Sequence, residues 1–298
     1  MNGEPVDFLS ISDAAKVKLK DAGAVLVQNV LGDRVSFEAI PTSEHRDDEI
    51  YLKQLKTPIP VISCFDLLQK QGERLKSGSE KLDELLDGGF KPGSLTEISG
   101  LPGSGKTQFC LQLCAVCQRP ENFGGRPGQA LFVDLNFGFS KSRYEGIRKY
   151  FIDQEKELDP IILRISTTNQ LLAAIESFPD ILLNNDKIRL IIIDSFSRPF
   201  MFDQVSSTLM SGIMMDLHSV AEDFDLVIIL TSQLITNLSS DQEEAIKHQP
   251  ALRSGYLYYI NERIMFYGSH EKREIIFPDK LDGVAAIYEI SNSGFVLK

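Results

Sequence analysis

The segment GLPGSGKT, residues 100–107, constrains the fold of this chain more than any other feature. It matches the pattern G-x-x-x-x-G-K-[ST], and it stands between a strand-like stretch, LTEIS, and a long apolar helical stretch. That order of strand, glycine-rich loop and helix is typical of a phosphate-binding P-loop, with a chance glycine-rich turn as the alternative. The sequence therefore predicts an α/β fold with a nucleotide site at this loop.

The residue types of the loop indicate how it would hold a nucleotide. Glycines let the backbone wind tightly, so that successive N–H groups and the helix N-terminus face the β- and γ-phosphates. Lys106 is expected to contact these phosphates, and Thr107 to offer its hydroxyl to Mg²⁺. We therefore predict ATP and Mg²⁺ as ligands. The predicted binding residues of the loop are Gly100, Gly103, Ser104, Gly105, Lys106 and Thr107.

Two polar residues close apolar strand-like runs further along the chain. Asp194 follows residues 190–193 and is predicted to hold Mg²⁺ through water, although polar residues are also common at strand ends. Gln233 follows residues 226–232 and is predicted to sense the γ-phosphate, the alternative being an ordinary polar loop residue. No glutamate comes directly after Asp194, so a catalytic base must come from another strand.

Short β-rich runs alternate with helix-length segments from Leu95 onward, which predicts a mostly parallel sheet covered on both faces. After Pro250 we expect the helices to stop and strands joined by hairpins to follow. The expected strands are 95–99, 130–134, 161–165, 190–194, 226–231, 263–267, 274–277 and 285–290. The expected helices are 107–119, 140–151, 169–178 and 205–223.

The start of the chain has a different pattern, with helical periodicity at 12–31 and then a polar, acidic stretch. We therefore predict a small N-terminal helical domain at 1–60, a linker at 61–76 and an ATPase core at 77–298. No run reaches the roughly 18 apolar residues of a membrane span, so no membrane contact is expected.

The cysteines and the net charge exclude other classes of site. Cys110, Cys114 and Cys117 fall on one face of the helix after the loop, and no second Cys or His pair completes a tetrahedral metal site, so a buried helix face is expected. Cys64 stands apart. With 31 Lys and Arg against 42 Asp and Glu, the charge of −11 repels a phosphate backbone, so DNA contact would require a local patch.

The segments GSEKLDELLDGG at 78–89 and GSLTEI at 93–98, with the loop and Gln108, resemble the RecA-like recombinase core of eukaryotic strand-exchange recombinases and their paralogues. The resemblance covers residues 76–298 and is weak before them. It implies a RecA-like P-loop ATPase fold, with Gln108 in the nucleotide site. It also implies that Arg143 lies near the purine ring, the alternative being an arginine on a solvated helix face.

The chain departs from the family after the run ALFVD at 130–134. The family reads Asp-Thr-Glu-Gly-Thr-Phe there, and its Glu orients or activates the attacking water. Here Asn136 stands at that position, and an amide cannot accept the proton. Because a general base contributes about 10²- to 10⁴-fold in rate, hydrolysis should be slow. Asn136, and the run PAL at 250–252 before Arg263, resemble the D-type branch of the paralogues.

The family binds single-stranded DNA through two loops. The first would be residues 198–202, whose Phe200 and Phe202 either stack on bases or belong to the core. The second would be residues 234–249, which are acidic and form a poor phosphate groove. The run FEA at 37–39 is a candidate peg for a neighbouring chain, although it does not match the family's Phe-x-x-Ala spacing.

These features favour a paralogue that binds ATP within a heteromeric complex for homologous recombination and double-strand break repair, with ATP mainly an assembly switch. Its expected partners are other recombinase paralogues, a recombinase filament, and single-stranded or branched DNA, which this chain alone binds weakly. Its expected location is the nucleus. The alternatives are an autonomous single-stranded-DNA-dependent ATPase with strand-exchange activity and, from the P-loop alone, a kinase, for which no cationic lid is visible.

Overall fold

The computed structural model describes residues 13–21, 73–152, 158–201, 206–237, 247–250, 254–268, 273–280 and 285–298. The chain divides into two compact units, Met1–Gln69 and Lys70–Lys298. In the first unit the described residues form helix α1 (Asp13–Asp21), which lies within the segment expected to be helical. The domain boundaries at 60 and 76 stay predictions. The second unit carries the candidate site.

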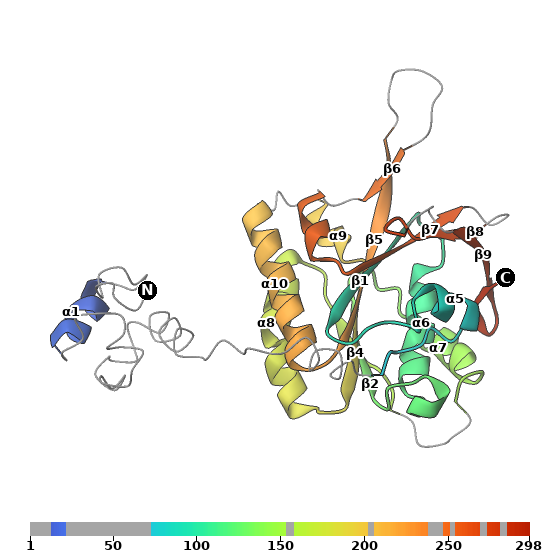
Figure 1. Cartoon of the computed structure of the whole chain (residues 1–298), viewed down its shortest axis with the longest axis horizontal. Coiled ribbons are helices and arrows are strands. Elements are labelled where there is room, and N and C mark those ends of the chain that lie inside the picture. Colours follow the sequence, from blue (N-terminus) through green and yellow to red (C-terminus); the bar gives the residue numbers. More distant parts are fainter. Residues whose placement is uncertain are drawn as a thin grey trace. The chain divides into compact units, whose positions relative to one another are not determined.

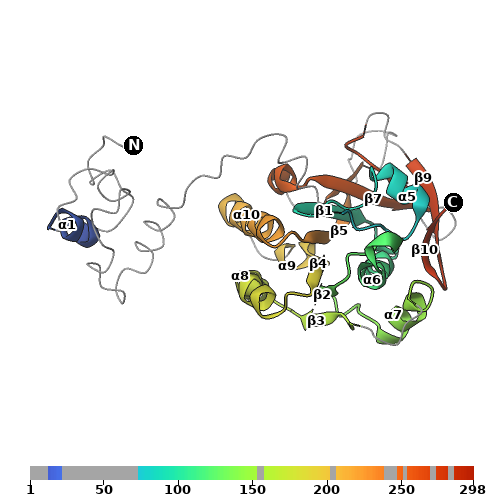
Figure 2. The ribbon, with the colours of Figure 1, turned by 60° about the horizontal axis from the view of Figure 1, so that its bottom comes forward.

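One sheet runs through the second unit (Figure 1 and Figure 2), with the strand order β10-β9-β8-β7-β1-β5-β4-β2-β3 and β6 paired to β5. From β7 to β3 neighbours pair in parallel, and from β7 to β10 they are antiparallel. The predicted mostly parallel sheet with C-terminal antiparallel hairpins is thereby confirmed. The strands are β1 (Ser94–Gly100), β2 (Gln129–Asp134), β3 (Ile161–Arg164), β4 (Ile188–Asp194), β5 (Val227–Asn237), β6 (Lys247–Pro250), β7 (Glu262–Gly268), β8 (Arg273–Ile276), β9 (Ala285–Ser291) and β10 (Gly294–Leu297).

Helices cover both faces of this sheet (Figure 2). Helices α5, α6 and α7 lie on one face, and α8 and α10 lie on the other. Apolar strand residues on each face pack against these helices, which is why the central strands read as continuous apolar runs. The helices of this unit are α5 (Glu80–Leu85), α6 (Lys106–Cys117), η3 (Glu121–Phe123), α7 (Lys141–Arg148), α8 (Thr168–Asn184), α9 (Ser197–Phe200), α10 (Ser207–Asp223) and η4 (Ser254–Tyr259).

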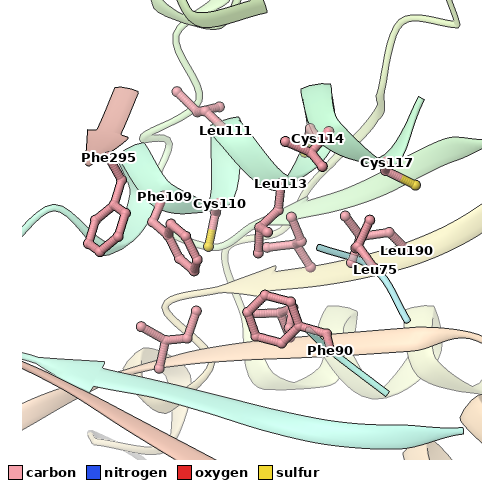
Figure 3. Packing of buried hydrophobic residues seen from close by; sticks show 14 of the residues in the cluster. Leu75, Phe90, Phe109, Cys110, Leu111, Leu113, Cys114, Cys117, Leu190 and Phe295 are labelled. Atoms are coloured by element: carbon pink, nitrogen blue, oxygen red, sulfur yellow. The ribbon is translucent and has the colours of Figure 1, made fainter. Parts of the chain in front are cut away.

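Helix α6 is buried along almost its whole length, from Phe109 to Cys117, and its side chains pack on the sheet (Figure 3). Helix α7 also contacts α6. The three cysteines of α6 are free and buried, which confirms the buried-face interpretation. Burial raises the pKa of the Cys117 thiol to about 12. Among the described residues, no group of His, Cys, Asp and Glu could hold a metal ion, and Cys64 lies outside them. No described helix combines the length and the apolar character that crossing a bilayer requires.

Two helix predictions were wrong. Helix α8 continues past residue 178 to Asn184, through Pro179, because Leu182 beyond the proline is buried in the core under α8 and α10. The second error concerns the chain after Pro250, where η4 follows although no further helix was expected. Its Tyr256 is buried and donates a hydrogen bond to the carboxylate of Glu97 in β1, so tertiary contact holds this turn.

The strand pattern near the C-terminus also differs from the expectation. Strand β5 runs to Asn237 and pairs with β6, so much of the predicted second DNA loop, 234–249, is strand. Residues 238–246 lie outside the described residues. Strand β10 was not predicted, and its Phe295 and Leu297 are buried. The hairpin of β9 and β10 therefore belongs to the core.

We expect Gly294→Ala to destabilise the fold by at least about 2 kcal/mol. Gly294 has a φ of +112°, and a Cβ there would lie 2.3 Å from Oε1 of Gln112 in α6. Urea unfolding measures the effect, with Gly146→Ala as the control. Gly146 lies in α7 with open space around it, so alanine there should stabilise the fold by about 0.5–1 kcal/mol. Wild-type stability for Gly294→Ala would contradict the docking of the hairpin on α6.

Candidate nucleotide-binding site

The glycine-rich loop connects the buried strand β1 to α6, as its sequence context predicts. Gly103 and Gly105 have φ values of +78° and +100°, a region that side chains with a Cβ rarely adopt. A Cβ on Gly105 would also lie 2.9 Å from Cδ1 of Ile290 in β9. The loop conformation therefore requires glycine, and the C-terminal hairpin lies directly against it.

Lys106 begins α6, and its side chain folds back over the loop. Its Nζ donates to the carbonyl oxygens of Gly100, at 2.8 Å, and Leu101, at 3.0 Å. Burial lowers the pKa of Lys106 to about 8, and the nearby Asp194 carboxylate limits the decrease. A cation is thus held at the mouth of the loop, where phosphates would require it.

The lowered pKa of Lys106 predicts how nucleotide binding depends on pH. At pH values well below its pKa of about 8 the ammonium is charged, so affinity for Mg·ADP should be constant there. Above this pKa the free protein loses this proton and binding must take one up, so binding should be about tenfold weaker at pH 9 than at pH 7.5. Calorimetric titration across this range measures the effect. An unchanged Kd would show that the Lys106 charge does not contribute to binding.

Asp194 ends β4 and is brought against the start of α6. Its carboxylate accepts the Thr107 hydroxyl at 2.8 Å and, on its other oxygen, the Thr231 hydroxyl at 2.6 Å. Burial raises the pKa of Asp194, and both hydroxyl contacts oppose that shift. A carboxylate beside a threonine hydroxyl is a set of hard oxygen ligands, so the predicted Mg²⁺ pair, Thr107 and Asp194, fits the ion. Thr231 was missed by sequence analysis; its only signal is a hydroxyl near the end of an apolar strand.

The loop that carries Asn136 is anchored by Asp134, the last residue of β2. The two carboxylate oxygens of Asp134 accept the backbone N–H groups of Gly138, at 2.9 Å, and Phe139, at 3.0 Å. The loop thereby turns back toward the phosphate loop, because a Cβ on Gly138 would lie 3.7 Å from Cγ2 of Thr107. Asn136 itself is exposed. The loop that carries Asn136 therefore lies next to Thr107 and Asp194.

Gln233 lies in β5, directly opposite Gly100 of β1 in the sheet register. Its backbone N–H donates to the hydroxyl of Ser197, at 3.1 Å, and the residue is half-buried. The interpretation as an ordinary loop residue was therefore wrong. The position next to the start of the phosphate loop is compatible with the predicted γ-phosphate sensor, a role that stays a prediction.

Arg143 of α7 lies beside Gln108, which is in the first turn of α6. The guanidinium of Arg143 donates to Oε1 of Gln108 and to the carbonyl oxygens of Ser291, at 2.6 Å, and Asn292, at 3.0 Å. Arg143 is half-buried, so it is not a freely solvated side chain on a helix face. It connects the predicted nucleotide site to the turn between β9 and β10, and its contact with a purine stays a prediction.

In the first candidate DNA-binding segment, residues 198–202, Phe200 and Arg198 contact other parts of the fold. Phe200 is buried and its ring lies 5.2 Å from that of Phe196, so the core interpretation is confirmed for this residue. Arg198 donates to the carbonyl of Leu135, so its cation is held at the loop that carries Asn136. The second aromatic, Phe202, and the candidate peg at 37–39 lie outside the described residues.

The sheet order, the glycine-rich loop between β1 and α6, and the carboxylate at the end of β4 define a RecA-like P-loop domain. The Rad51 family model matches residues 69–253, and the chain belongs to this family. It is a RecA-like recombinase paralogue, because several relatives carry the names of RAD51 homologues. Its assignment to the D-type branch stays a prediction.

Three relatives illustrate the match. DNA repair protein RAD51 homolog 3 of Cricetulus griseus is 27% identical over 92% of this chain and 86% of its own length. DNA repair protein RAD51 homolog 2 of Homo sapiens is 30% identical over 73% of this chain and 67% of its own length. DNA repair and recombination protein RadA of Metallosphaera sedula is 30% identical over 55% of this chain and 53% of its own length. These relatives are thus named as proteins of DNA repair and recombination.

Proposed function

We propose that this chain binds Mg·ATP and acts within a heteromeric complex of recombinase paralogues in homologous recombination and DNA double-strand break repair. ATP is mainly an assembly switch and is hydrolysed slowly. The observation that supports this most is the combination of a complete phosphate site, with Lys106 over the loop and Thr107 paired to Asp194, and an amide at Asn136. Such a site holds a nucleotide without a base to activate water.

The nearby carboxylates are poor substitutes for the missing base. Both oxygens of Asp134 accept backbone N–H groups, and both oxygens of Asp194 accept threonine hydroxyls. Protonation of a carboxylate engaged in this way weakens these charge-assisted contacts, which opposes transfer of a proton from water. Because Asn136 cannot accept a proton, slow turnover follows from the groups around the site.

A slowly hydrolysed nucleotide is suited to control assembly. Any ligand that binds one state of a protein and not another stabilises the state that it binds. If the ATP-bound chain docks partners better, the energy of nucleotide binding is coupled to assembly. Other recombinase paralogues and a recombinase filament are the proposed partners, in the nucleus. Weak contact with single-stranded or branched DNA agrees with the net charge of −11.

The mass of the complex purified from its native cell tests this function. With Mg·ATP present we expect one heteromeric species that contains this chain and other paralogues. After removal of nucleotide and Mg²⁺, the chain should be released from it. A mass that is the same with and without nucleotide would rule out the switch, and a chain found only as a homomer would rule out the heteromeric complex.

The alternative is an autonomous ATPase stimulated by single-stranded DNA, with strand-exchange activity. The positions of Lys106 and Gln233 around the loop favour it, since both groups would also serve turnover. The two functions differ in whether bound ATP persists.

A further inference from the structure

Tyr288 in β9 makes a direct contact with the phosphate loop. Its side chain is buried, and its hydroxyl donates to the carbonyl oxygen of Ser104 at 2.5 Å. The ring is fixed by neighbouring aromatic rings, since its centroid lies 5.0 Å from that of Phe266 and 4.9 Å from that of Phe295. The hydroxyl therefore holds one direction in space, toward the loop.

The contact sets the orientation of one peptide group of the loop. A peptide unit is planar and trans, so the C=O of Ser104 and the N–H of Gly105 point in opposite directions. The hydroxyl of Tyr288 fixes the C=O toward β9. The N–H of Gly105 is therefore turned away from β9, and Gly105 reaches this geometry because its φ is +100°. Backbone N–H groups of such a loop are what an anion contacts.

The β9–β10 hairpin, which carries Tyr288, is itself held in place on α6 and α7. The backbone N–H of Phe295 donates to Oε1 of Gln112 in α6, at 2.7 Å, and Nε2 of Gln112 donates to the carbonyl of Ser77, at 2.8 Å. At the turn of the hairpin, Arg143 of α7 donates to two backbone carbonyls. The hairpin cannot shift without breaking these contacts, so Tyr288 acts on the loop from a fixed support.

We propose that Tyr288 is a positioning residue of the nucleotide site, which acts through Ser104 to direct the N–H of Gly105 at the β-phosphate of a nucleoside di- or triphosphate. The proposal rests on the proposed function, because it takes a nucleotide as the ligand. It predicts a selective effect. Loss of the hydroxyl weakens ligands that have a β-phosphate and leaves a nucleoside monophosphate unaffected.

Tyr288→Phe in the full chain removes the hydroxyl and keeps the aromatic packing. We expect the Kd for Mg·ADP to rise about fivefold to tenfold, and the Kd for AMP to stay within about twofold. Tyr144→Phe is the matched control, because Tyr144 is equally buried and its hydroxyl accepts a hydrogen bond from Gln118, at 2.6 Å, away from the loop. The control should leave both constants within about twofold of wild type.

Calorimetric or competition titration of wild type, Tyr288→Phe and Tyr144→Phe with Mg·ADP and AMP measures these constants. An unchanged Kd for Mg·ADP in Tyr288→Phe overturns the proposal, and so does an equal loss in Tyr144→Phe. An equal loss for AMP and Mg·ADP shows general loosening of the fold and also overturns it. If wild-type protein binds no nucleotide, the proposed function fails as well, so this outcome is distinct from a failure confined to Tyr288.

Discussion

Replacing Lys106 with alanine is expected to weaken the binding of Mg·ATP by roughly 30- to 150-fold, which corresponds to about 2–3 kcal/mol for a charge-assisted contact in a buried site. The ammonium is held over the loop by the carbonyl groups of Gly100 and Leu101, so its charge is already in place at the loop where the phosphates are proposed to bind. Without this ammonium, no positive charge at this position would offset the repulsion between the phosphates and the oxygens of these carbonyl groups and of the Asp194 carboxylate. Equilibrium titration with a fluorescent nucleotide measures the change.

Lys187→Ala is the control for this variant. It removes the same charge, but Lys187 is exposed and precedes β4, at the opposite end of that strand from Asp194. Its Kd for Mg·ATP should stay within about twofold of wild type, since a distant exposed charge is screened. The phosphate site would be wrongly assigned if the two alanine variants bound Mg·ATP equally well.

Replacing Asn136 with glutamate is expected to raise the rate of ATP hydrolysis by about 10²-fold or more, the contribution that a positioned general base typically makes. Asn136 is exposed, so a carboxylate there does not have to be buried. The Asp134 contacts with Gly138 and Phe139 hold the loop beside Thr107, which keeps the new group near the phosphates. Phosphate release under saturating Mg·ATP gives the rate.

Asn136→Gln separates the chemistry of the base from the size of the side chain. Glutamine has the length of glutamate and cannot accept the proton, so its rate should remain that of wild type. Equal turnover in the glutamate and glutamine variants would show that residue 136 does not lie at the water-positioning site. Slow turnover would then need a cause other than the amide.

The sequence allowed prediction of those parts of the site that depend on neighbours along the chain. The glycines, Lys106 and Thr107 are contiguous, and Asp194 closes an obvious apolar strand, so local pattern was enough for these residues. Thr231 and Tyr288 could not be found in this way. Their hydroxyls act on Asp194 and Ser104, which are distant in sequence, and only the order of strands in the sheet brings them together.

The errors in the fold have a similar cause. Pro179 normally disfavours a helix, but burial of Leu182 outweighs that local preference. Strand β10 is short and follows a turn, so it has little pattern of its own. Its Phe295 is held by a contact with Gln112 and by packing against Phe109, which no local sequence signal reveals.

We expect this protein to hold ATP and to hydrolyse it slowly. The most direct measurement is to load the isolated chain with Mg·ATP and to follow how much bound ATP remains intact, with and without single-stranded DNA. We predict that the bound nucleotide persists as ATP and that DNA does not speed its loss. Brisk turnover stimulated by single-stranded DNA would contradict slow hydrolysis and identify the chain as an autonomous ATPase.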